Sequence, residues 1–521
     1  MDGYSRRTFL AGAAGAALIG QAAGRVEAAA PGAPAGDPAA AAWGTVMPRI
    51  RRRIRPPRFP GRTFPITDHG AVGDGSTKCT DAFERAVAAC ARAGGGRVLV
   101  PSGTYLTGAV HLADNVELHL EPDATIRFSR DPADYLPVVY TRYEGVELMN
   151  YSPFIYAHGR TNVAITGRGT IDGQADAEHW WDWSGDPPPS EGPDKKLLAS
   201  MAEAGVPVAE RVFGAGHHLR PNLIQLYRCR NVLIEGVTVR DSPMWNIHPV
   251  LCTNVTIREV TVDSPRGPNN DGCDPESCVD VLIERCVFNT GDDCVAIKAG
   301  KNADGRRVNA PSMNVLVDSC VMRDGNGGVT VGSETTGGVR WVFAWNCTMS
   351  SERLERAIRV KTNPERGGYV RDLYFRDITV GQAADAVIEV ALNYENKPTG
   401  PYFPDVRDLD IRRLRAGRAP RAFNLIGNPD NPIRDIRVTN SVFEEMAEAD
   451  VVRDVTGLVL RNVWINGRRV HVLKIEQRGH QLVQALVEVR EVAGVPNLLD
   501  RHVLHGVSSS SQHAALRSFR L

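Results

Sequence analysis

The fold of this chain is decided by the stretch Asn231-Val-Leu-Ile-Glu-Gly-Val-Thr-Val239, which returns closely as Asn254-Val-Thr-Ile-Arg-Glu-Val-Thr-Val262. Two further copies begin at Asp280 and Asn314, and weaker copies extend the series in both directions. Successive starts are 23, 26 and 34 residues apart, which leaves no room for a helix beside the strands. Each copy alternates β-branched residues between turn residues, a pattern typical of short strands.

Units of this length bury their apolar faces only by stacking on their neighbours. The sequence therefore predicts an all-β protein, a right-handed parallel β-helix (solenoid) with repeats from about residue 95 to 465. Asn or Asp at the start of each copy suits such a stack, because its side chain bonds backbone groups or its counterpart in the next coil. Leucine-rich repeats are disfavoured because their consensus is absent. Propeller blades need roughly 40 or more residues each.

The ends of the predicted solenoid differ from its repeats. Residues 81–93 have helical spacing of apolar side chains and stop at Gly94-Gly95-Gly96, so we expect a short N-terminal capping helix. The catalytic domain is predicted over residues 62–465. Residues 466–521 break the pattern and are predicted as a C-terminal extension, a candidate for disorder.

The N-terminus has the pattern of an export signal. Arg6-Arg7 precedes a mildly apolar Ala/Gly/Leu stretch, and small residues follow at Ala28-Ala29-Ala30. This order predicts a twin-arginine signal over residues 1–30 and a periplasmic or extracellular protein. Residues 31–61 are rich in Pro, Ala and Arg and are predicted as a linker, with the basic run as a solvated tether.

Composition excludes several classes of protein. The chain has 521 residues and 42% hydrophobic residues, enough for a large core, so global disorder is excluded. Its 61 Lys and Arg balance 61 Asp and Glu, which argues against a nucleic-acid partner. No apolar run is long enough to span a bilayer, and we expect a monomer. We interpret Cys229, Cys286, Cys320 and Cys347 as a stack of buried thiols rather than disulfides or a zinc site.

Two acidic clusters lie on consecutive repeats. Asp271 lies in Asn269-Asn270-Asp271, and Asp292 and Asp293 lie in Gly291-Asp292-Asp293, 21 residues further on. That interval is close to one coil, so the clusters should lie about 4.8 Å apart, one strand spacing. Carboxylates forced so close raise the pKa of at least one member, which gives one acid and one base.

Two cations follow on a later coil. Arg359 and Lys361 are two residues apart and share one face of a strand. Beside an acidic centre, such a pair suits an anionic substrate. Each of these features alone is ordinary turn or surface chemistry, and the argument rests on their order along neighbouring coils.

The ordered set resembles glycoside hydrolase family 28, the polygalacturonase family. The motifs of that family, Asn-x-Asp, Gly-Asp-Asp, Gly-His-Gly and Arg-Ile-Lys, correspond to Asn269–Asp271, Gly291–Asp293, Gly325-Asn326-Gly327 and Arg359-Val360-Lys361. Flanking stretches such as GTIDGQ (169–174) and GDDCVAIKAG (291–300) resemble bacterial members. The likeness covers roughly residues 62–465.

The resemblance implies metal-independent, inverting hydrolysis of a galacturonate-containing pectic polysaccharide or oligosaccharide, without a cofactor. It implies that Asp292 is the general acid and that Asp271 and Asp293 hold the attacking water. Arg359 and Lys361 would bind the galacturonate carboxylate on the leaving-group side. Asn269, Asn326 and Tyr394 are expected to contact the substrate.

Several features leave the substrate and outcome open. Asn326 replaces the usual histidine of the family; it still forms hydrogen bonds but does not titrate. His248 either contacts substrate or is a satisfied turn histidine, and Trp180, Trp181 and Trp183 either line a sugar-binding wall or pack within their own loop. Rhamnogalacturonan or substituted galacturonan are alternative substrates.

Three alternatives stay open at this point. A carboxyl separation near 5 Å is typical of retaining rather than inverting hydrolases. A polysaccharide lyase has the same kind of solenoid and uses a calcium-binding carboxylate cluster. A carbohydrate-binding solenoid without catalysis would not need the acidic trio beside two cations.

Overall fold

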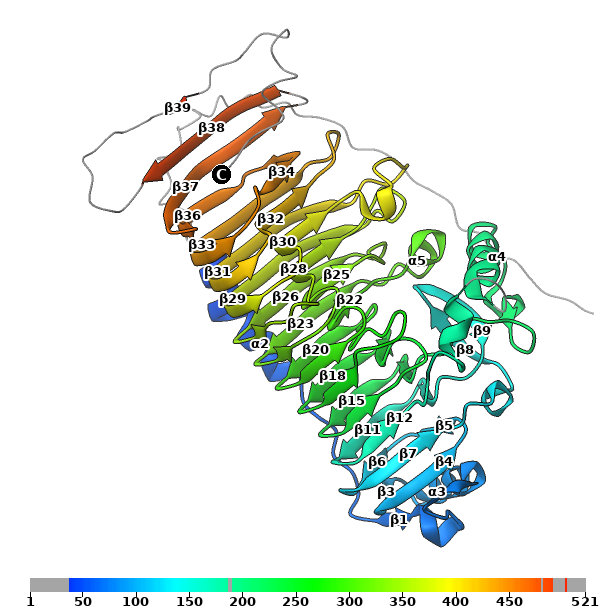
Figure 1. Ribbon diagram of the computed structural model, residues 1–521. Helices are drawn as coiled ribbons and strands as arrows, with labels where there is room; N and C mark the ends of the chain where they lie inside the picture. The colour runs from blue at the N-terminus through cyan, green and yellow to red at the C-terminus, as the bar shows by residue number, and fades with distance from the viewer. Residues whose placement is uncertain (1–36, 186–189, 479–480, 491–501, 504–521) are drawn as a thin grey trace, which may run out of the picture.

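The computed structural model describes residues 37–185, 190–478, 481–490 and 502–503, and these form one right-handed parallel β-helix (Figure 1). Each coil contributes up to three short strands, which stack on those of the next coil in three rows. The first row comprises β1 (Thr63–Pro65), β3 (Gly96–Val100), β6 (Val116–Leu120), β11 (Thr161–Gly167), β15 (Arg230–Glu235), β18 (Thr253–Arg258), β20 (Val279–Glu284), β23 (Ser312–Asp318), β26 (Val339–Trp345), β29 (Tyr369–Gln382), β31 (Asp405–Ala419), β33 (Ile433–Met446) and β36 (Val459–Ile465).

The second and third rows complete each coil. The second row comprises β2 (Asp74–Lys78), β4 (Gly103–Thr107), β7 (Ala124–Phe128), β12 (Thr170–Asp172), β16 (Thr238–Arg240), β19 (Thr261–Ser264), β21 (Val287–Thr290), β24 (Val321–Met322) and β27 (Thr348–Met349). The third row comprises β5 (Val110–His111), β10 (Ile155–His158), β14 (Ile224–Tyr227), β17 (Ile247–Val250), β22 (Val295–Ile297), β25 (Val329–Gly332), β28 (Arg356–Lys361), β30 (Ala386–Ala391), β32 (Arg421–Ile426) and β34 (Val451–Arg453).

The sequence repeats coincide with the first row. Val232 is paired with Val255, Val255 with Val281 and Val281 with Val315, so equivalent residues of the four copies lie in one line along the stack. All pairs in this part of the row are parallel. The predicted fold class is confirmed.

The turn residue that opens each copy forms a ladder. Asn115, Asn162, Asn231 and Asn254 all have φ between 57° and 60°, a left-handed conformation that Asn tolerates better than most residues. The Nδ2 atom of each of the last three donates to Oδ1 of its predecessor at 2.8–2.9 Å. The ladder explains why the repeats begin with Asn or Asp.

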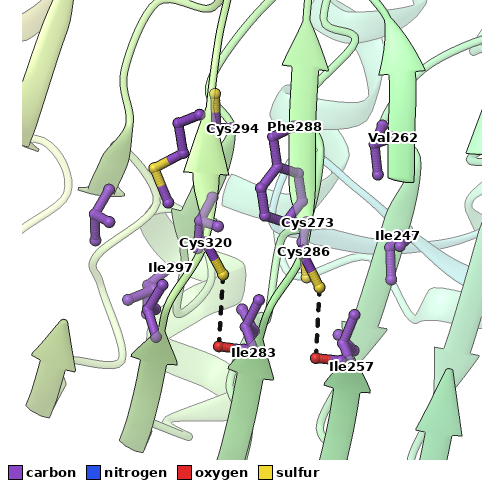
Figure 2. Close-up of a cluster of buried hydrophobic side chains, with 14 of the residues drawn as sticks. Ile247, Ile257, Val262, Cys273, Ile283, Cys286, Phe288, Cys294, Ile297 and Cys320 are labelled. Carbon is purple, nitrogen blue, oxygen red and sulfur yellow. Dashed lines mark hydrogen bonds between the residues drawn. The ribbon is translucent and has the colours of Figure 1, made fainter. Parts of the chain in front are cut away.

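The interior of the solenoid is filled by aliphatic residues and thiols (Figure 2). All ten cysteines of the chain lie in the described part, and all are buried and free. Cys286, Cys320 and Cys347 contact one another along the stack, as expected. Cys229 does not belong to this line. It lies beside Cys252 in a second stack, which continues to Cys278.

The two ends of the stack are covered differently. Helix α3 (Thr80–Arg92) packs its apolar face against η2 (Ile66–His69) and the first strands, as the predicted capping helix should. At the other end, β36 pairs antiparallel with β37 (Arg468–Arg478), which pairs with β38 (Gln481–Arg490), and β39 (His502–Val503) follows. Part of the extension that was a candidate for disorder therefore continues the sheet.

Residues 38–53, which the sequence predicts as part of a linker, are helical and lie along the outside of the solenoid (Figure 1). They form α1 (Pro38–Ala41), η1 (Ala42–Val46) and α2 (Met47–Arg53). Arg51 pairs with Glu284 at 2.8 Å, and Arg53 pairs with Asp280 at 2.7 Å. Two arginines of the basic run are therefore paired with acidic side chains of the first row, although both stay partly exposed. The predicted twin-arginine signal lies outside the described residues.

Helices and a hairpin project from the solenoid, in part from insertions between second-row and third-row strands and in part after third-row strands (Figure 1). They are β8 (Val139–Tyr143), β9 (Val146–Asn150), α4 (Glu191–Glu203), β13 (Val212–Phe213) and α5 (Asn302–Val308), with the turns η3 (Pro132–Tyr135), η4 (Trp181–Ser184), η5 (Val208–Glu210) and η6 (Tyr394–Asn396). Among the described residues, no helix has the length and apolar character needed to cross a membrane.

Candidate active site

The three aspartates come from two neighbouring coils of the third row. Among the described residues, the coil between β17 and β22 has no third-row strand and is joined to its neighbours by isolated bridges. Cys273 of this coil is bridged to Ile247 of β17 on one side and to Val295 of β22 on the other. Asp271 precedes Cys273 by two residues, and Asp293 precedes Val295 by two, so the register places the two aspartates side by side. The backbone N–H of Gly272 donates to the carbonyl oxygen of Asp293 at 2.9 Å, which fixes this alignment.

The carboxyl groups of Asp271, Asp292 and Asp293 converge, and one oxygen of each lies within 4.8 Å of the others. Asp271 and Asp293 are buried, and Asp292 is half-buried. Three carboxylates this close do not all stay ionised at their usual pKa, because like charges repel strongly where water is scarce. The coil spacing read from the sequence does bring the trio together.

Asp293 is the ionised member of the trio. Its Oδ2 lies 2.7 Å from Nζ of Lys361, and its Oδ1 lies 3.4 Å from the guanidinium of Arg359. The Thr330 hydroxyl also donates to Oδ1, at 3.0 Å. Burial alone would raise the pKa of Asp293, but the charges of Lys361, Arg359 and Lys298 outweigh it and lower the pKa to about 2.

Asp292 has a raised pKa, which favours its protonated form. Burial raises its pKa, and the negative charge of Asp293 raises it further. Its Oδ1 accepts hydrogen bonds from the backbone N–H of Asp293 and from Nδ2 of Asn326, both at 2.9 Å. Oδ2 is left as the position for the proton. A protonated carboxyl beside an ionised one is the arrangement that acid–base catalysis requires.

Asp271 faces a lysine that was not among the predicted site residues. Nζ of Lys298 lies 3.4 Å from Oδ2 of Asp271 and 4.3 Å from the ring centroid of Trp245. Burial raises the pKa of Asp271 and the charge of Asp292 adds to this, whereas Lys298 lowers it. Burial is the largest of these influences, so the pKa of Asp271 lies well above its ordinary value in spite of Lys298. The signal in the sequence was a lysine on the strand directly after Gly291-Asp292-Asp293.

Arg359 and Lys361 lie side by side on β28, as their spacing predicts, and are 8% and 6% exposed. Nε of Arg359 donates to Glu389 at 3.0 Å. The ring of Tyr394 lies 5.3 Å from Nζ of Lys361 and 6.0 Å from the guanidinium carbon of Arg359. Two cations framed by an aromatic ring suit a ligand with a carboxylate on a sugar ring.

The region with this geometry also matches known proteins. A family model described as "Glycosyl hydrolases family 28" matches residues 213–414, which contain the trio and both cations. A "Probable polygalacturonase" from Vitis vinifera is 31% identical over 414 residues, which cover 75% of this chain and 77% of that protein. This chain belongs to glycosyl hydrolases family 28.

Two further relatives of this family 28 chain are exo-acting by name. The solved structure of a hyperthermoactive exopolygalacturonase from Thermotoga maritima is 45% identical, with a TM-score of 0.81, over 83% of this chain and 98% of that one. An exo-poly-alpha-D-galacturonosidase from Dickeya chrysanthemi is 26% identical over 77% of this chain and 65% of its own length.

Asn269, a predicted substrate contact of this family 28 chain, forms a hydrogen bond with another residue of the protein. Its Oδ1 accepts a hydrogen bond of 2.8 Å from the guanidinium of Arg220. Arg220 is buried and also pairs with Glu191 of α4 at 2.8 Å. Asn269 therefore ties the catalytic turn to the projecting helix.

His248 is fully buried, with no exposed surface. Its Nδ1 lies 3.0 Å from the amide of Asn222 and 3.1 Å from that of Gln225, and its Nε2 lies 2.9 Å from Glu276. Both ring nitrogens are thus occupied beneath the surface. The structure places His248 as a satisfied interior histidine, and the prediction that it contacts substrate is wrong.

The tryptophans of the insertion pack within the protein. Trp180 and Trp183 are buried and lie 5.0 Å apart between ring centroids. Trp180 packs edge-on against Phe154 at 5.5 Å, and Nε1 of Trp181 donates to the carbonyl oxygen of Ser242 at 2.9 Å. The structure therefore favours the packed-loop alternative over a sugar-binding wall.

A polar hollow of about 330 Å³ is lined in part by Gly291, which precedes Asp292, and by Asn326, which donates a hydrogen bond to Asp292. It lies along the turns that precede β22, β25 and β28, and its wall includes Thr290, Asp324, Asn326, Arg353 and Glu355. Carboxylate, amide and guanidinium groups of this kind bind sugar hydroxyls through hydrogen bonds. The space beside the proposed acid Asp292 is thus suited to a carbohydrate.

Proposed function

We propose that this protein hydrolyses the bond between galacturonate units of a pectic polysaccharide or oligosaccharide. The observation that carries the proposal is the convergence of Asp271, Asp292 and Asp293 within 4.8 Å, with Lys361 only 2.7 Å from Asp293. A carbohydrate-binding solenoid has no need for three converging carboxylates, which cost stability when they are buried together.

In the proposed reaction, Asp292 donates its proton to the glycosidic oxygen as the bond to the anomeric carbon breaks. A water molecule held by Asp271 and Asp293 forms the new carbon–oxygen bond and gives up a proton to one of them. Asp292 is left ionised and regains a proton from solvent, and the aspartate that accepted the proton of the water releases it to solvent, before the next cycle. Arg359 and Lys361 hold the carboxylate of the leaving sugar. No step requires a metal ion, and Lys298 and Lys361 already supply positive charge to Asp271 and Asp293.

We further propose that the enzyme releases sugars from one end of the chain. Two relatives named above are exo-acting by name, one of them 45% identical over 83% of this chain. The products distinguish the two modes: an exo enzyme releases short products from the first minutes, whereas an endo enzyme first produces long fragments and a rapid fall in viscosity.

We also propose export by the twin-arginine route and action outside the cytoplasm as a monomer. The paired arginines at residues 6 and 7 and the small residues at 28–30 support export. Replacing Arg6 and Arg7 with lysine in a host that has this pathway should retain the protein in the cytoplasm. Sedimentation of the protein without residues 1–30 tests its oligomeric state.

The central experiment measures reducing-end release from polygalacturonate by the parent protein and by Asp292→Asn. Release by the parent but not by the variant supports hydrolysis with Asp292 as the acid. An unsaturated product that absorbs in the ultraviolet would instead identify a lyase. Absence of cleavage by the folded parent would refute the proposed substrate and direct the assay to rhamnogalacturonan.

A further inference from the structure

Two buried lysines flank the aspartate trio on the same line of the third row. Ile297 is paired with Val331, and Gly332 is paired with Lys361. Lys298 follows Ile297 and therefore lies opposite Gly332, in line with Lys361. The two lysines are two strand spacings apart, roughly 10 Å at the backbone.

The surroundings of the two lysines match each other. Lys298 is 3% exposed and Lys361 is 6% exposed. Nζ of Lys298 lies 3.4 Å from Asp271, and Nζ of Lys361 lies 2.7 Å from Asp293. An aromatic ring lies beside each ammonium group, Trp245 at 4.3 Å and Tyr394 at 5.3 Å. The trio is thus enclosed by two similar cation-and-ring units.

The strand position between the two lysines carries no side chain. Gly332 has φ of 101°, and a Cβ there would lie 2.0 Å from the carbonyl oxygen of Lys361, so only glycine fits. The adjacent outward positions on β22 and β25 are Ala296 and Thr330, both small. Only small residues therefore separate the two lysines along the row.

Lys298 keeps hydrogen-bonding capacity for such a ligand. Its contact with Asp271 uses one of the three ammonium donors. Its contacts with Glu334 and Asp274, at 3.5 and 3.9 Å, are charge pairs only, and Oε2 of Glu334 and both carboxyl oxygens of Asp274 have no hydrogen-bond partner. The ammonium group is a compact point charge that rotates its remaining donors toward an incoming carboxylate.

We propose that Lys298 binds the carboxylate of the uronate on the non-leaving side of the cleaved bond, opposite the leaving sugar held by Arg359 and Lys361. The inference rests on the proposed function and names the residue that recognises the second uronate of its substrate. The site then requires a uronate on both sides of the bond, as in contiguous galacturonan. A neutral sugar, such as the rhamnose of a rhamnogalacturonan, offers no carboxylate to the remaining donors of Lys298.

The test uses three galacturonate oligosaccharides of equal length. The first is fully charged, the second has its non-leaving sugar reduced at C6 to neutral galactose, and the third has its leaving sugar reduced in the same way. With the parent enzyme, loss of either carboxylate should lower kcat/KM by roughly 10- to 100-fold, because each one makes a charge-assisted hydrogen bond. Equal cleavage of the first and second substrates would overturn the inference.

Variants assign the effect to the lysine. Lys298→Met should cleave the charged substrate poorly and should no longer distinguish it from the second substrate, while still rejecting the third. Lys298→Arg keeps the charge and should keep the distinction. Lys301→Met is the matched control, because Lys301 pairs with Glu144 at 3.1 Å away from the trio, and it should behave as the parent does.

The outcomes separate the possible failures. If Lys298→Met still discriminates between the first two substrates, Lys298 only balances the charge of Asp271 and the inference is wrong. If Lys298→Met does not fold, the parent and Lys298→Arg with the three substrates decide the question. If the folded parent cleaves none of the three, the proposed function itself fails, which is a different result from cleavage without discrimination.

Discussion

Nδ2 of Asn326 donates a hydrogen bond of 2.9 Å to Oδ1 of Asp292, from the position where the family motif has a histidine. The backbone N–H of Asn326 also bonds the carbonyl oxygen of Asp292, at 3.2 Å. Asn326 therefore aims the proposed acid, and it does so with an amide that has no charge to lose. Residue 326 therefore does not titrate itself, and it affects the pH dependence of the enzyme only through its hydrogen bond to Asp292.

Asn326→Ala should lower kcat about 10-fold or more, because a hydrogen bond to a carboxylate is worth roughly 1.5–3 kcal/mol. Loss of a donor to the ionised form raises the pKa of Asp292. Since the acid works protonated, the alkaline limb of the kcat–pH profile should move to higher pH. Asn289→Ala is the control, because Asn289 makes an exposed bond to Asp263 on the second row. An unchanged alkaline limb in Asn326→Ala would count against this role.

Glu147 should make the protein sensitive to acid. Its carboxyl group is buried; burial would raise its pKa, but Arg142, Tyr140 and other partners lower the pKa to about 2. A depressed pKa contributes stability above the unfolded value of 4.5, and that contribution is lost as the pH falls toward 2.

Glu147→Gln removes this contribution. Its deficit in unfolding free energy should be about 3 kcal/mol above pH 4.5 and should shrink toward zero near pH 2. Thermal unfolding of both proteins across this range gives the comparison, with exposed Glu178→Gln as the control. A deficit that stays constant with pH would mean that Glu147 acts through packing alone.

Trp43 should hold the N-terminal segment on the solenoid. Its ring packs edge-on against Phe343 at 5.1 Å and Trp345 at 5.8 Å, with the guanidinium of Arg376 at 3.9 Å. Trp43→Ala removes about 3 kcal/mol of packing, so the segment should open roughly 100-fold more often.

Limited proteolysis measures this opening, because cleavage within residues 38–58 tracks the fraction of open segment. The exposed Arg49 on the same helix provides the matched variant, and Arg49→Ala should be cut at the parental rate. Equal cleavage of Trp43→Ala and the parent would show that the ion pairs of Arg51 and Arg53 hold the segment without the tryptophan.

The cysteine thiols should not react with thiol reagents in the folded protein. All ten cysteines are buried, and burial raises the pKa of thiols such as Cys273 and Cys294, to about 12 for Cys294. Thiolate is the reactive form, so a thiol reagent should label none of them at neutral pH and all ten in denaturant. Rapid labelling of one or more thiols without denaturant would reveal local opening of a coil.

Periodic features of the chain were predictable and others were not. The repeats from Asn231 to Asn314 determine which residues face inward, and a 21-residue interval brings Asp271 beside Asp292 because it equals about one coil. These inferences need only the period of the solenoid. The stack of Cys286, Cys320 and Cys347 was predicted correctly. Cys229 was wrongly included in it, because Cys229 occupies a different position in its coil.

Contacts that cross the repeat were not predictable. Arg51 reaches Glu284 across more than 200 residues, and nothing in the composition of residues 31–61 distinguishes a bound segment from a tether. The coil of His248 is near the trio, which suggested a contact with substrate. Its side chain is instead buried among polar residues. Lys298 lies on a motif strand, but its pairing with Asp271 depends on the register of three neighbouring coils.

The reaction should invert the configuration of the anomeric carbon. We expect inversion, because the chain belongs to family 28 and because Asp271 and Asp293 offer two adjacent acceptors for one water molecule. One oxygen of each aspartate lies within 4.8 Å of the others, closer than the roughly 6.5–9.5 Å between the carboxyl groups of inverting pairs and near the 5–5.5 Å of retaining ones. Inversion therefore requires the substrate to widen the trio or the water to lie at its edge. Proton NMR of the first product from α-linked galacturonate should show the β-anomer before mutarotation, and an initial α-anomer would identify one aspartate as a nucleophile.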